Sequence, residues 1–314
     1  MWHARFLCLL STAQAGNILS RQDTAQIAWN VSGFTAYDVL NYTNTHLDDS
    51  PRIETPLRIL CVGDSITEGA GSSSNGGDGN GYRLSLAEHL SREDVVFAGT
   101  RQRGSMKGNY HAAWSESLEQ RPNVVLLHAG TNDMDQRSSV SKEGSDPKGA
   151  AKRLGHLIDQ TIRYCPDAVI LVAIPLSSCD RFKSKMTEYR AMIPEVVRQR
   201  REDGKHVVAV DFSTFDLKDL RDCLHPTNEG YRIMGDYWYD FLTQVPEGWI
   251  KEPVGDDPER EEENGVGLRV GVDLRRAVGF VVGLIFDPTV NLDGPIPLLL
   301  YRQAVARFLI RRNP

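Results

Sequence analysis

The sequence has no apolar run long enough to cross a bilayer and no long run of basic residues. A transmembrane helix needs about 20 mostly apolar residues in succession. The best late candidate, Ala277 to Phe286, is shorter and is interrupted by Gly279 and Gly283. The formal net charge is -6, so the basic surface that attracts nucleic acid is missing. We therefore expect neither an integral membrane protein nor a nucleic-acid-binding protein.

Metal-binding and nucleotide-binding patterns are also missing. The chain has 5 cysteines and 8 histidines, and nothing around His111 or His128 has the Cys, His and carboxylate spacing of a zinc site. The glycine-rich segment 69–81 lacks the Gly-Lys-Ser/Thr ending of a phosphate-binding loop and does not open with the dinucleotide-binding fingerprint. We therefore predict no metal and no cofactor, and we interpret this segment as a flexible loop beside the substrate cleft.

The first 15 residues have the pattern of a secretory signal peptide. His3 and Arg5 precede a short apolar run, Phe6 to Leu10. Ala13-Gln14-Ala15 then has the small-x-small pattern of a signal-peptidase site. We predict a signal peptide over residues 1–15 and therefore a secreted protein; an ordinary N-terminal segment is the alternative.

The next segment and the cysteines fit an extracellular protein. Asn30 and Asn41 begin Asn-x-Ser/Thr tripeptides, which are acceptors for N-glycosylation in secreted proteins. Removal of Cys8 with a signal peptide leaves four cysteines, an even number compatible with one or two disulfides. We predict a bridge between Cys179 and Cys223, because both lie in loop-like segments.

From Leu57 onward, short apolar runs alternate with longer amphipathic segments. The apolar runs are Leu57 to Val62, Val95 to Ala98, Val124 to His128, Val169 to Ile174 and Val207 to Val210. The amphipathic segments are Tyr82 to Leu90, Lys148 to Tyr164, Thr187 to Arg201 and Glu229 to Leu242. Apolar strands that alternate with helices predict a parallel sheet covered on both faces. The predicted fold class is α/β, doubly wound, with a five-stranded parallel sheet.

Composition changes on both sides of this domain, which we place at residues 56–246. Residues 16–55 are polar and irregular and are interpreted as an N-terminal extension. Residues 247–314 are interpreted as a linker and a C-terminal tail, because an acidic run between 251 and 264 is typical of a solvated linker. The tail contains no pattern that indicates chemistry.

Polar residues follow three of the predicted strands. Gly63-Asp64-Ser65 comes after the first apolar run and Gly130-Thr131-Asn132-Asp133 after the third. Asp222-Cys223-Leu224-His225-Pro226 lies beyond the fifth. Loops that leave the carboxyl ends of parallel strands form the ligand crevice in such sheets. We therefore expect these three segments to converge on one site.

The residue types at these strand ends suit nucleophilic catalysis. A serine hydroxyl is a poor nucleophile near neutral pH, so it needs a base, an acid that orients the base, and donors for the oxyanion. We predict that Ser65 is the nucleophile, His225 the base and Asp222 the orienting carboxylate. Asn132 and the backbone N–H of Ser65 are the expected oxyanion donors. Asp64 is expected to pin the turn of Ser65.

The neighbour of Asn132 has a supporting role in this prediction. Asp133 is expected to hold its own loop and not to react, because a turn residue of this type is used for local hydrogen bonding more often than for catalysis.

These blocks resemble the SGNH, or GDSL, hydrolases. The resemblance rests on Gly63 to Gly69, on Gly130 to Asp133 and on Asp222-x-x-His225-Pro226, and it extends over about residues 56–246. It implies a flavodoxin-like three-layer α/β/α fold, the triad of Ser65, Asp222 and His225, and Asn132 as an oxyanion donor. Gly81-Tyr82-Arg83 and Leu126 to Met134 look most like carbohydrate esterase family 3, whose members remove acetyl groups from xylan.

The second block departs from the family pattern. Members similar to family 3 carry a His-Ser-Gly-Trp segment whose glycine N–H joins the oxyanion hole, whereas the corresponding residues here are His111-Ala112-Ala113-Trp114. Ala113 keeps the N–H, so the resemblance implies that it is an oxyanion donor. Its added Cβ lies next to the reacting carbonyl and is expected to lower the rate or limit the acyl group. Gly99, Gly104 and Gly108 are the alternative donors.

The predicted function is hydrolysis of small acyl esters, acetyl esters above all, on a carbohydrate such as xylan, through an acyl-enzyme on Ser65. The predicted partner is therefore an acylated carbohydrate. One alternative is a lysophospholipase or thioesterase with the same chemistry. The other is a catalytically weak carbohydrate-binding relative, which is supported only by Ala113.

Overall fold

We analysed a computed structural model of the chain. The structure describes residues 39–44, 53–103, 106–108, 114–137, 139–141, 145–178, 180–246 and 248–258. The predicted signal peptide, the tripeptide at Asn30 and the tail beyond residue 258 lie outside these residues. Within them, no helix is both long and apolar enough to cross a membrane.

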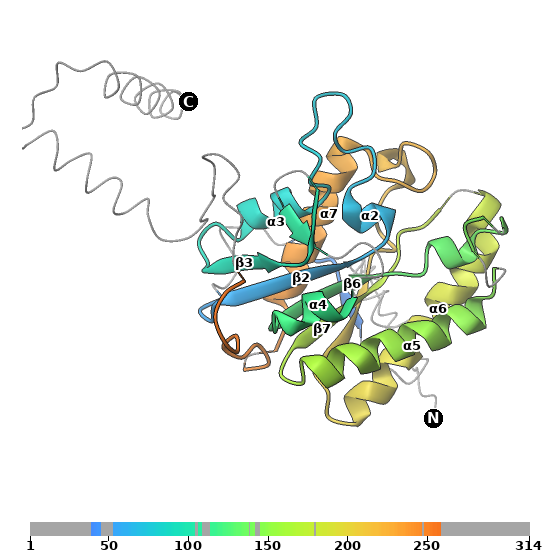
Figure 1. The fold of residues 1–314 in the computed structure, drawn as a ribbon. Coiled ribbons are helices and arrows are strands. Elements are labelled where there is room, and N and C mark those ends of the chain that lie inside the picture. Colours follow the sequence, from blue (N-terminus) through green and yellow to red (C-terminus); the bar gives the residue numbers. More distant parts are fainter. Residues whose placement is uncertain are drawn as a thin grey trace, which may run out of the picture.

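The centre of the molecule is a parallel sheet of six strands in the order β1-β8-β7-β6-β2-β3 (Figure 1). Its strands are β1 (Val39–Asn41), β2 (Leu57–Gly63), β3 (Val95–Ala98), β6 (Val124–His128), β7 (Val169–Ile174) and β8 (Val207–Asp211). A separate antiparallel pair consists of β4 (Arg101–Arg103) and β5 (Met106–Gly108). The α/β fold class predicted from the sequence is confirmed.

The strand count differs from the five that the sequence predicts. The sixth strand, β1, comes from the segment interpreted as an N-terminal extension. It lies at the edge of the sheet and pairs with β8, from Val39 beside Ala209 to Asn41 beside Asp211. Three residues are too few to show a strand pattern in the sequence. The pairing with β8, which is a long-range contact, defines this strand.

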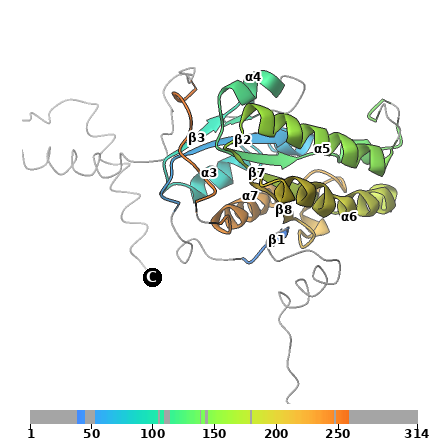
Figure 2. The same ribbon diagram turned by 90° about the horizontal axis from the view of Figure 1, so that it is seen from below.

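Helices cover both faces of the sheet (Figures 1 and 2). Helices α3 (Arg83–His89) and α7 (Asn228–Thr243) pack together on one face, and α5 (Pro147–Tyr164) and α6 (Asp180–Glu202) pack together on the other. A shorter helix, α4 (Trp114–Glu119), lies next to α5. Alternate residues of β6 belong to different apolar clusters, Leu126 to the α7 side and Leu127 to the α6 side. This two-sided burial explains the continuous apolar runs in the sequence.

Asn41 and Thr43, of the second predicted glycosylation tripeptide, lie within the described residues. The backbone N–H of Thr43 donates to Asp240 at 2.8 Å, and the threonine hydroxyl is bonded to the same carboxylate. The carbonyl of Asn41 accepts a hydrogen bond from Gln244 at 3.0 Å. Glycosylation of Asn41 stays a prediction.

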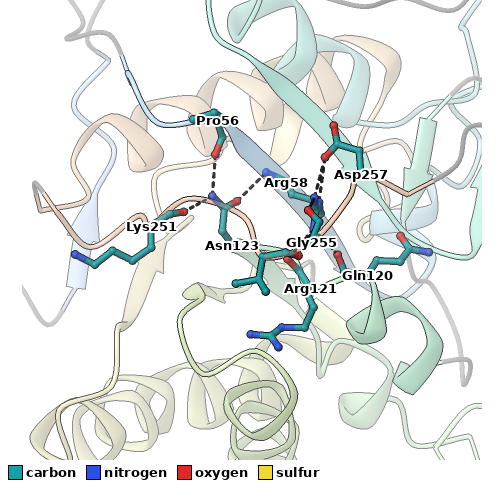
Figure 3. A network of polar contacts seen from close by, with 9 residues as sticks. Pro56, Arg58, Gln120, Arg121, Asn123, Lys251, Gly255 and Asp257 are labelled. Carbon is teal, nitrogen blue, oxygen red and sulfur yellow. Dashed lines mark hydrogen bonds and ion pairs between the residues drawn. The ribbon is translucent and has the colours of Figure 1, made fainter.

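A buried arginine attaches the segment after α7 to the body of the domain (Figure 3). Arg58 on β2 is only 2% exposed. Its guanidinium donates to the carbonyls of Val254 at 2.9 Å and Gly255 at 2.8 Å, and to the Asp257 carboxylate at 2.9 Å. Residues 251–258 were predicted to begin a solvated linker. Their side chains are mostly exposed, but the segment is fastened to the domain, because Arg58 needs acceptors for its buried charge.

A second buried polar residue fastens the same segment. Asn123 donates from its side-chain amide to the carbonyls of Pro56 at 2.8 Å and Lys251 at 2.6 Å, and it accepts from the backbone N–H of Arg58 at 2.7 Å. The start of β2 and the segment at Lys251 are therefore joined through one side chain. Residues 251–257, which follow the predicted boundary at residue 246, are thus bonded to the domain through Arg58 and Asn123.

Replacing Arg58 with methionine is expected to lower the free energy of unfolding by about 2–4 kcal/mol, because the carbonyls of Val254 and Gly255 lose their donors. Asp257→Asn is the matched control. The Asp257 side chain is 59% exposed, so water screens its ion pair and we expect a change of less than about 1 kcal/mol. Urea denaturation of both variants measures the difference. Equal destabilisation by the two substitutions would contradict the importance of the contacts from Arg58 to these carbonyls.

Candidate active site

The turn after β2 holds Ser65 at the start of a short helix, α2 (Ser65–Glu68). Asp64 is the residue before this helix, and its carboxylate accepts the backbone N–H of Ile66 at 3.0 Å. Gly63 is required by close packing, since an added Cβ would overlap the side chain of Thr67 and the backbone oxygen of His128. The cap by Asp64 and the close packing at Gly63 together fix the turn between β2 and α2, and so the position of Ser65.

Ser65, His225 and Asp222 form one hydrogen-bonded chain. The Oγ of Ser65 lies 2.8 Å from Nε2 of His225. The other ring nitrogen, Nδ1, lies 2.8 Å from Oδ2 of Asp222. The structure thus brings together the three residues that the sequence predicts as nucleophile, base and orienting acid, although 160 residues separate Ser65 from His225.

A tight loop between β8 and α7 presents His225. An isolated β-bridge joins Leu220 to Pro226 across the loop, and the backbone N–H of Arg221 donates to the carbonyl of His225 at 2.8 Å. Cys223 adopts a positive φ of 65° at the turn. Because short-range bonds close this loop on itself, His225 is held by backbone geometry as well as by Asp222.

Thr227 and Cys223 fix the two sides of the same loop. Thr227 caps α7, with its hydroxyl accepting the Gly230 N–H at 3.0 Å. Cys223 is disulfide-bonded. Cys179, its predicted partner, lies outside the described residues, so that pairing stays a prediction.

Asp222 is held in its ionised form. Partial burial raises the pKa of its carboxyl, but hydrogen bonds from the His225 backbone N–H, the His225 ring and the Leu224 N–H bring the net pKa below its usual value. One carboxylate oxygen accepts the two backbone N–H groups at 2.7 and 3.2 Å and leaves the other for the imidazole. The carboxylate therefore orients His225 with a charge that persists into mildly acidic solution.

Asn132 begins a 3-10 helix, η2 (Asn132–Met134), that directly follows β6. The strands β6 and β2 are parallel neighbours. Asn132 and Ser65 follow the carboxyl ends of these two strands and therefore lie at the same end of the sheet. Its side chain is half-buried, and its amide makes no hydrogen bond to any other described residue. This placement leaves the amide free to donate to a ligand oxygen.

Asp133 holds its loop through an ion pair. Its carboxylate accepts from Arg153 on α5 at 2.6 and 3.1 Å. Asp133 is thus bound to a helix on the far side of the loop and is not part of the hydrogen-bonded chain at Ser65. Arg153, which carries no motif, was not identified from the sequence.

A tyrosine on α6 supports the loop before Asn132. Tyr189 is buried, and its hydroxyl donates to the carbonyl of Ala129 at 3.0 Å. Gly130 has a φ of 102° and lies against this ring, where an added Cβ would overlap it. The sequence contains no signal for Tyr189, because only the packing of α6 on the sheet brings it to this loop.

Replacing Gly130 with alanine is expected to destabilise the domain by about 3 kcal/mol, through an unfavourable positive φ and overlap with Tyr189. It is also expected to reduce kcat, since it displaces the loop of Asn132. Gly204→Ala is the matched control: its φ is 75°, but nothing lies within 4 Å of the added Cβ. We expect about 1 kcal/mol there. Thermal or urea unfolding of both variants tests this, and similar losses in the two would rule out a packing role for Tyr189.

His128 is separate from the hydrogen-bonded chain. It is completely buried at the end of β6, and this burial lowers its pKa although nearby Asp64 raises it. Burial therefore favours the neutral imidazole. In the part of the chain that the structure describes, no group of three or more His, Cys, Asp or Glu side chains is placed to hold a metal ion.

Ala113, the expected third oxyanion donor, lies outside the described residues. The participation of Ala113 stays a prediction.

The sequence is similar to a known protein family and to curated proteins. A family model described as the GDSL-like lipase/acylhydrolase family matches residues 61–233, more than half of the chain. A multidomain esterase of Ruminococcus flavefaciens is 27% identical over 257 residues, covering 67% of this chain and 31% of that protein. A putative endoglucanase X of Acetivibrio thermocellus is 27% identical over 128 residues, covering 40% of this chain and 51% of that protein.

The chain thus spans about a third to a half of the length of these curated relatives. Among solved structures, a Clostridium thermocellum family 3 carbohydrate esterase is similar, with a TM-score of 0.43 and 23% identity over 60% of this chain and 98% of that one. The matched residues 61–233 include Ser65, Asn132, Asp222 and His225. The chain therefore belongs to the GDSL-like lipase/acylhydrolase family.

Proposed function

We propose that the protein is a serine esterase that removes small acyl groups, acetyl above all, from a carbohydrate such as xylan. The observation that carries this proposal is the chain of two 2.8 Å contacts from Ser65 through His225 to Asp222. A serine bound to an imidazole that a carboxylate orients is the arrangement required for acyl transfer.

In the proposed reaction, the Oγ of Ser65 attacks the ester carbonyl while its proton passes to Nε2 of His225. The resulting oxyanion accepts hydrogen bonds from the backbone N–H of Ser65 and the amide of Asn132; one such donor contributes about 3 kcal/mol to transition-state stabilisation. Collapse breaks the bond to the alcohol, which leaves with the proton from His225. An acyl-enzyme on Ser65 remains.

Deacylation follows the same path with water in place of serine. His225 takes a proton from a water molecule as its oxygen attacks the acyl carbonyl, and it returns that proton to Oγ when the carboxylic acid leaves. Asp222 holds Nδ1–H throughout, so that Nε2 is the nitrogen that accepts and donates. None of these steps uses a metal or a cofactor.

The carbohydrate part of the proposal has two supports. The segments Gly81-Tyr82-Arg83 and Leu126 to Met134 resemble carbohydrate esterase family 3, and the curated relatives are named an esterase and a putative endoglucanase. The site is also open: Ser65 and His225 are only half-buried and the Asp222 side chain is 52% exposed. An open site suits an acyl group carried on a polymer chain.

Acetate release from acetylated xylan, compared with fatty-acid release from a lysophospholipid, tests the substrate class. We expect release from the xylan and a rate on p-nitrophenyl esters that falls as the acyl chain lengthens from acetate. A rate that rises with chain length, together with lysophospholipid hydrolysis, would contradict the carbohydrate assignment and favour the lipid alternative. Binding to xylan without any turnover would favour a carbohydrate-binding relative.

A further inference from the structure

The loop between α2 and α3, residues 69–81, is rich in glycine and is held by polar contacts, among them internal backbone hydrogen bonds and a bond from the Tyr231 hydroxyl to the carbonyl of Ala70 at 3.1 Å. It includes six glycines, Gly69, Gly71, Gly76, Gly77, Gly79 and Gly81, and glycine loses more conformational freedom on ordering than other residues. A cavity of about 160 Å³ lies between Gly76 and Gly77 of this loop and Tyr231 of α7. Packing is therefore incomplete at Gly76 and Gly77, and hydrogen bonds hold this part of the loop.

One of those contacts reaches α7. The side-chain amide of Asn228, the first residue of α7, donates to the carbonyl of Ser74 at 2.8 Å. The amide oxygen of Asn228 accepts from Nη2 of Arg221 at 3.3 Å. Asn228 thus links the tip of the glycine-rich loop to Arg221, the residue directly before Asp222.

Arg221 joins this link to the loop that carries His225. Its Nε donates to the carbonyl of Pro226 at 3.1 Å, and its backbone N–H donates to the carbonyl of His225 at 2.8 Å. Its guanidinium also lies against Gly71, where an added Cβ would overlap it. A continuous path of contacts therefore runs from Ser74 to the backbone of His225.

We propose that Arg221 and Asn228 form a latch that ties the glycine-rich loop, residues 69–81, to the loop of His225, and that this latch positions the histidine for catalysis. The inference rests on the proposed function of His225. Arg221 and Asn228 act through His225 and are positioning residues. From the sequence, residues 69–81 are interpreted as a flexible loop beside the substrate cleft. In this proposal the loop is instead held against the loop of His225.

The glycines provide a matched test of the latch from the loop side. Gly71 and Gly76 have nearly equal φ angles, 77° and 80°, so alanine strains the backbone similarly at both. An added Cβ at Gly71 displaces the Arg221 guanidinium, whereas nothing lies within 4 Å at Gly76. We expect Gly71→Ala to lower kcat for p-nitrophenyl acetate by about tenfold with KM within about twofold, because a small shift of a catalytic group is costly. Gly76→Ala is expected to keep kcat within about twofold.

Variants of the latch itself give a second test. Arg221→Met and Asn228→Ala are each expected to lower kcat by about tenfold, and the double variant by no more than the larger single effect, since both break one path. Arg221→Lys, which keeps the charge and a donor, is expected to recover part of the activity. Multiplying effects in the double variant, or equal kcat in Gly71→Ala and Gly76→Ala, would overturn the proposal.

Amide hydrogen exchange separates failure of the latch from failure of the proposed function. Exchange in peptides covering residues 69–81 and 220–228 is expected to speed up in Gly71→Ala and Asn228→Ala but not in Gly76→Ala, whatever the activity. If the unsubstituted protein has no esterase activity, the proposed function is contradicted. The amide hydrogen exchange measurement still decides whether the latch exists. Unchanged exchange in both variants would show that Arg221 and Asn228 do not hold the loop.

Discussion

Replacing Ser65 with alanine is expected to lower kcat for p-nitrophenyl acetate by about 10⁵- to 10⁶-fold, because the attacking oxygen is removed and only binding and oxyanion contacts remain. The half-buried side chain makes a single hydrogen bond to a described residue, the 2.8 Å contact with His225. The free energy of unfolding is therefore expected to change by about 1 kcal/mol or less. A loss of activity without a loss of stability would identify Ser65 as the nucleophile.

Ser73→Ala is the matched control for this substitution. Ser73 is an exposed serine of the glycine-rich loop, so its replacement is expected to leave kcat within about twofold. Labelling by a fluorophosphonate probe adds a readout that does not depend on the substrate: the parent and Ser73→Ala are expected to be labelled and Ser65→Ala is not. Labelling or turnover by Ser65→Ala would refute the acyl-enzyme mechanism.

Replacing Asp222 with asparagine is expected to lower kcat by about 10³-fold. Asparagine can still accept the backbone N–H groups of Leu224 and His225, so the loop keeps its form. Its NH₂ group, however, faces Nδ1 of His225 and favours the tautomer that carries the proton on Nε2, which cannot accept the proton of Ser65. The loss is expected to be smaller than that for Ser65, because the Asp222 side chain is 52% exposed and water partly replaces it.

Asp219→Asn controls for the change of charge in the Asp222 experiment. Asp219 precedes the same loop and lies outside the chain of contacts at Ser65, so its replacement is expected to change kcat by less than about threefold. The pH dependence of kcat/KM for both variants gives a further readout. An Asp222→Asn enzyme with the parent rate would show that His225 is oriented by its backbone loop alone.

The main residues of the site could be predicted from the sequence because of a general property of parallel sheets. Ser65 and Asn132 follow apolar runs that became the neighbouring strands β2 and β6, and the carboxyl ends of such strands share one edge. Asp222 and His225 are only three residues apart, so a turn suffices to bring them together. Local pattern and spacing were enough for these positions.

The contacts that support the site could not be predicted in the same way. Tyr189 under Gly130, Arg153 on Asp133 and Arg221 against Gly71 all join segments that have no pattern in common. Each is an ordinary polar or aromatic residue whose partner is set by how a helix or loop packs. Their roles depend on tertiary contacts, and no motif in the sequence indicates which residues make those contacts.

The amino-acid sequence by itself determined the fold class, the family and the choice of Ser65, Asp222 and His225 as the candidate site, because periodic burial and short motifs are local properties of the chain. The tertiary structure alone decided the strand order, the sixth strand from Val39–Asn41, and the fastening of residues 251–258 by the buried Arg58. The physical reason is that a three-residue strand and an exposed acidic segment acquire structure only from distant partners. Residues 39–41 form a strand because they pair with β8, and residues 251–258 are held in place because they bond to Arg58.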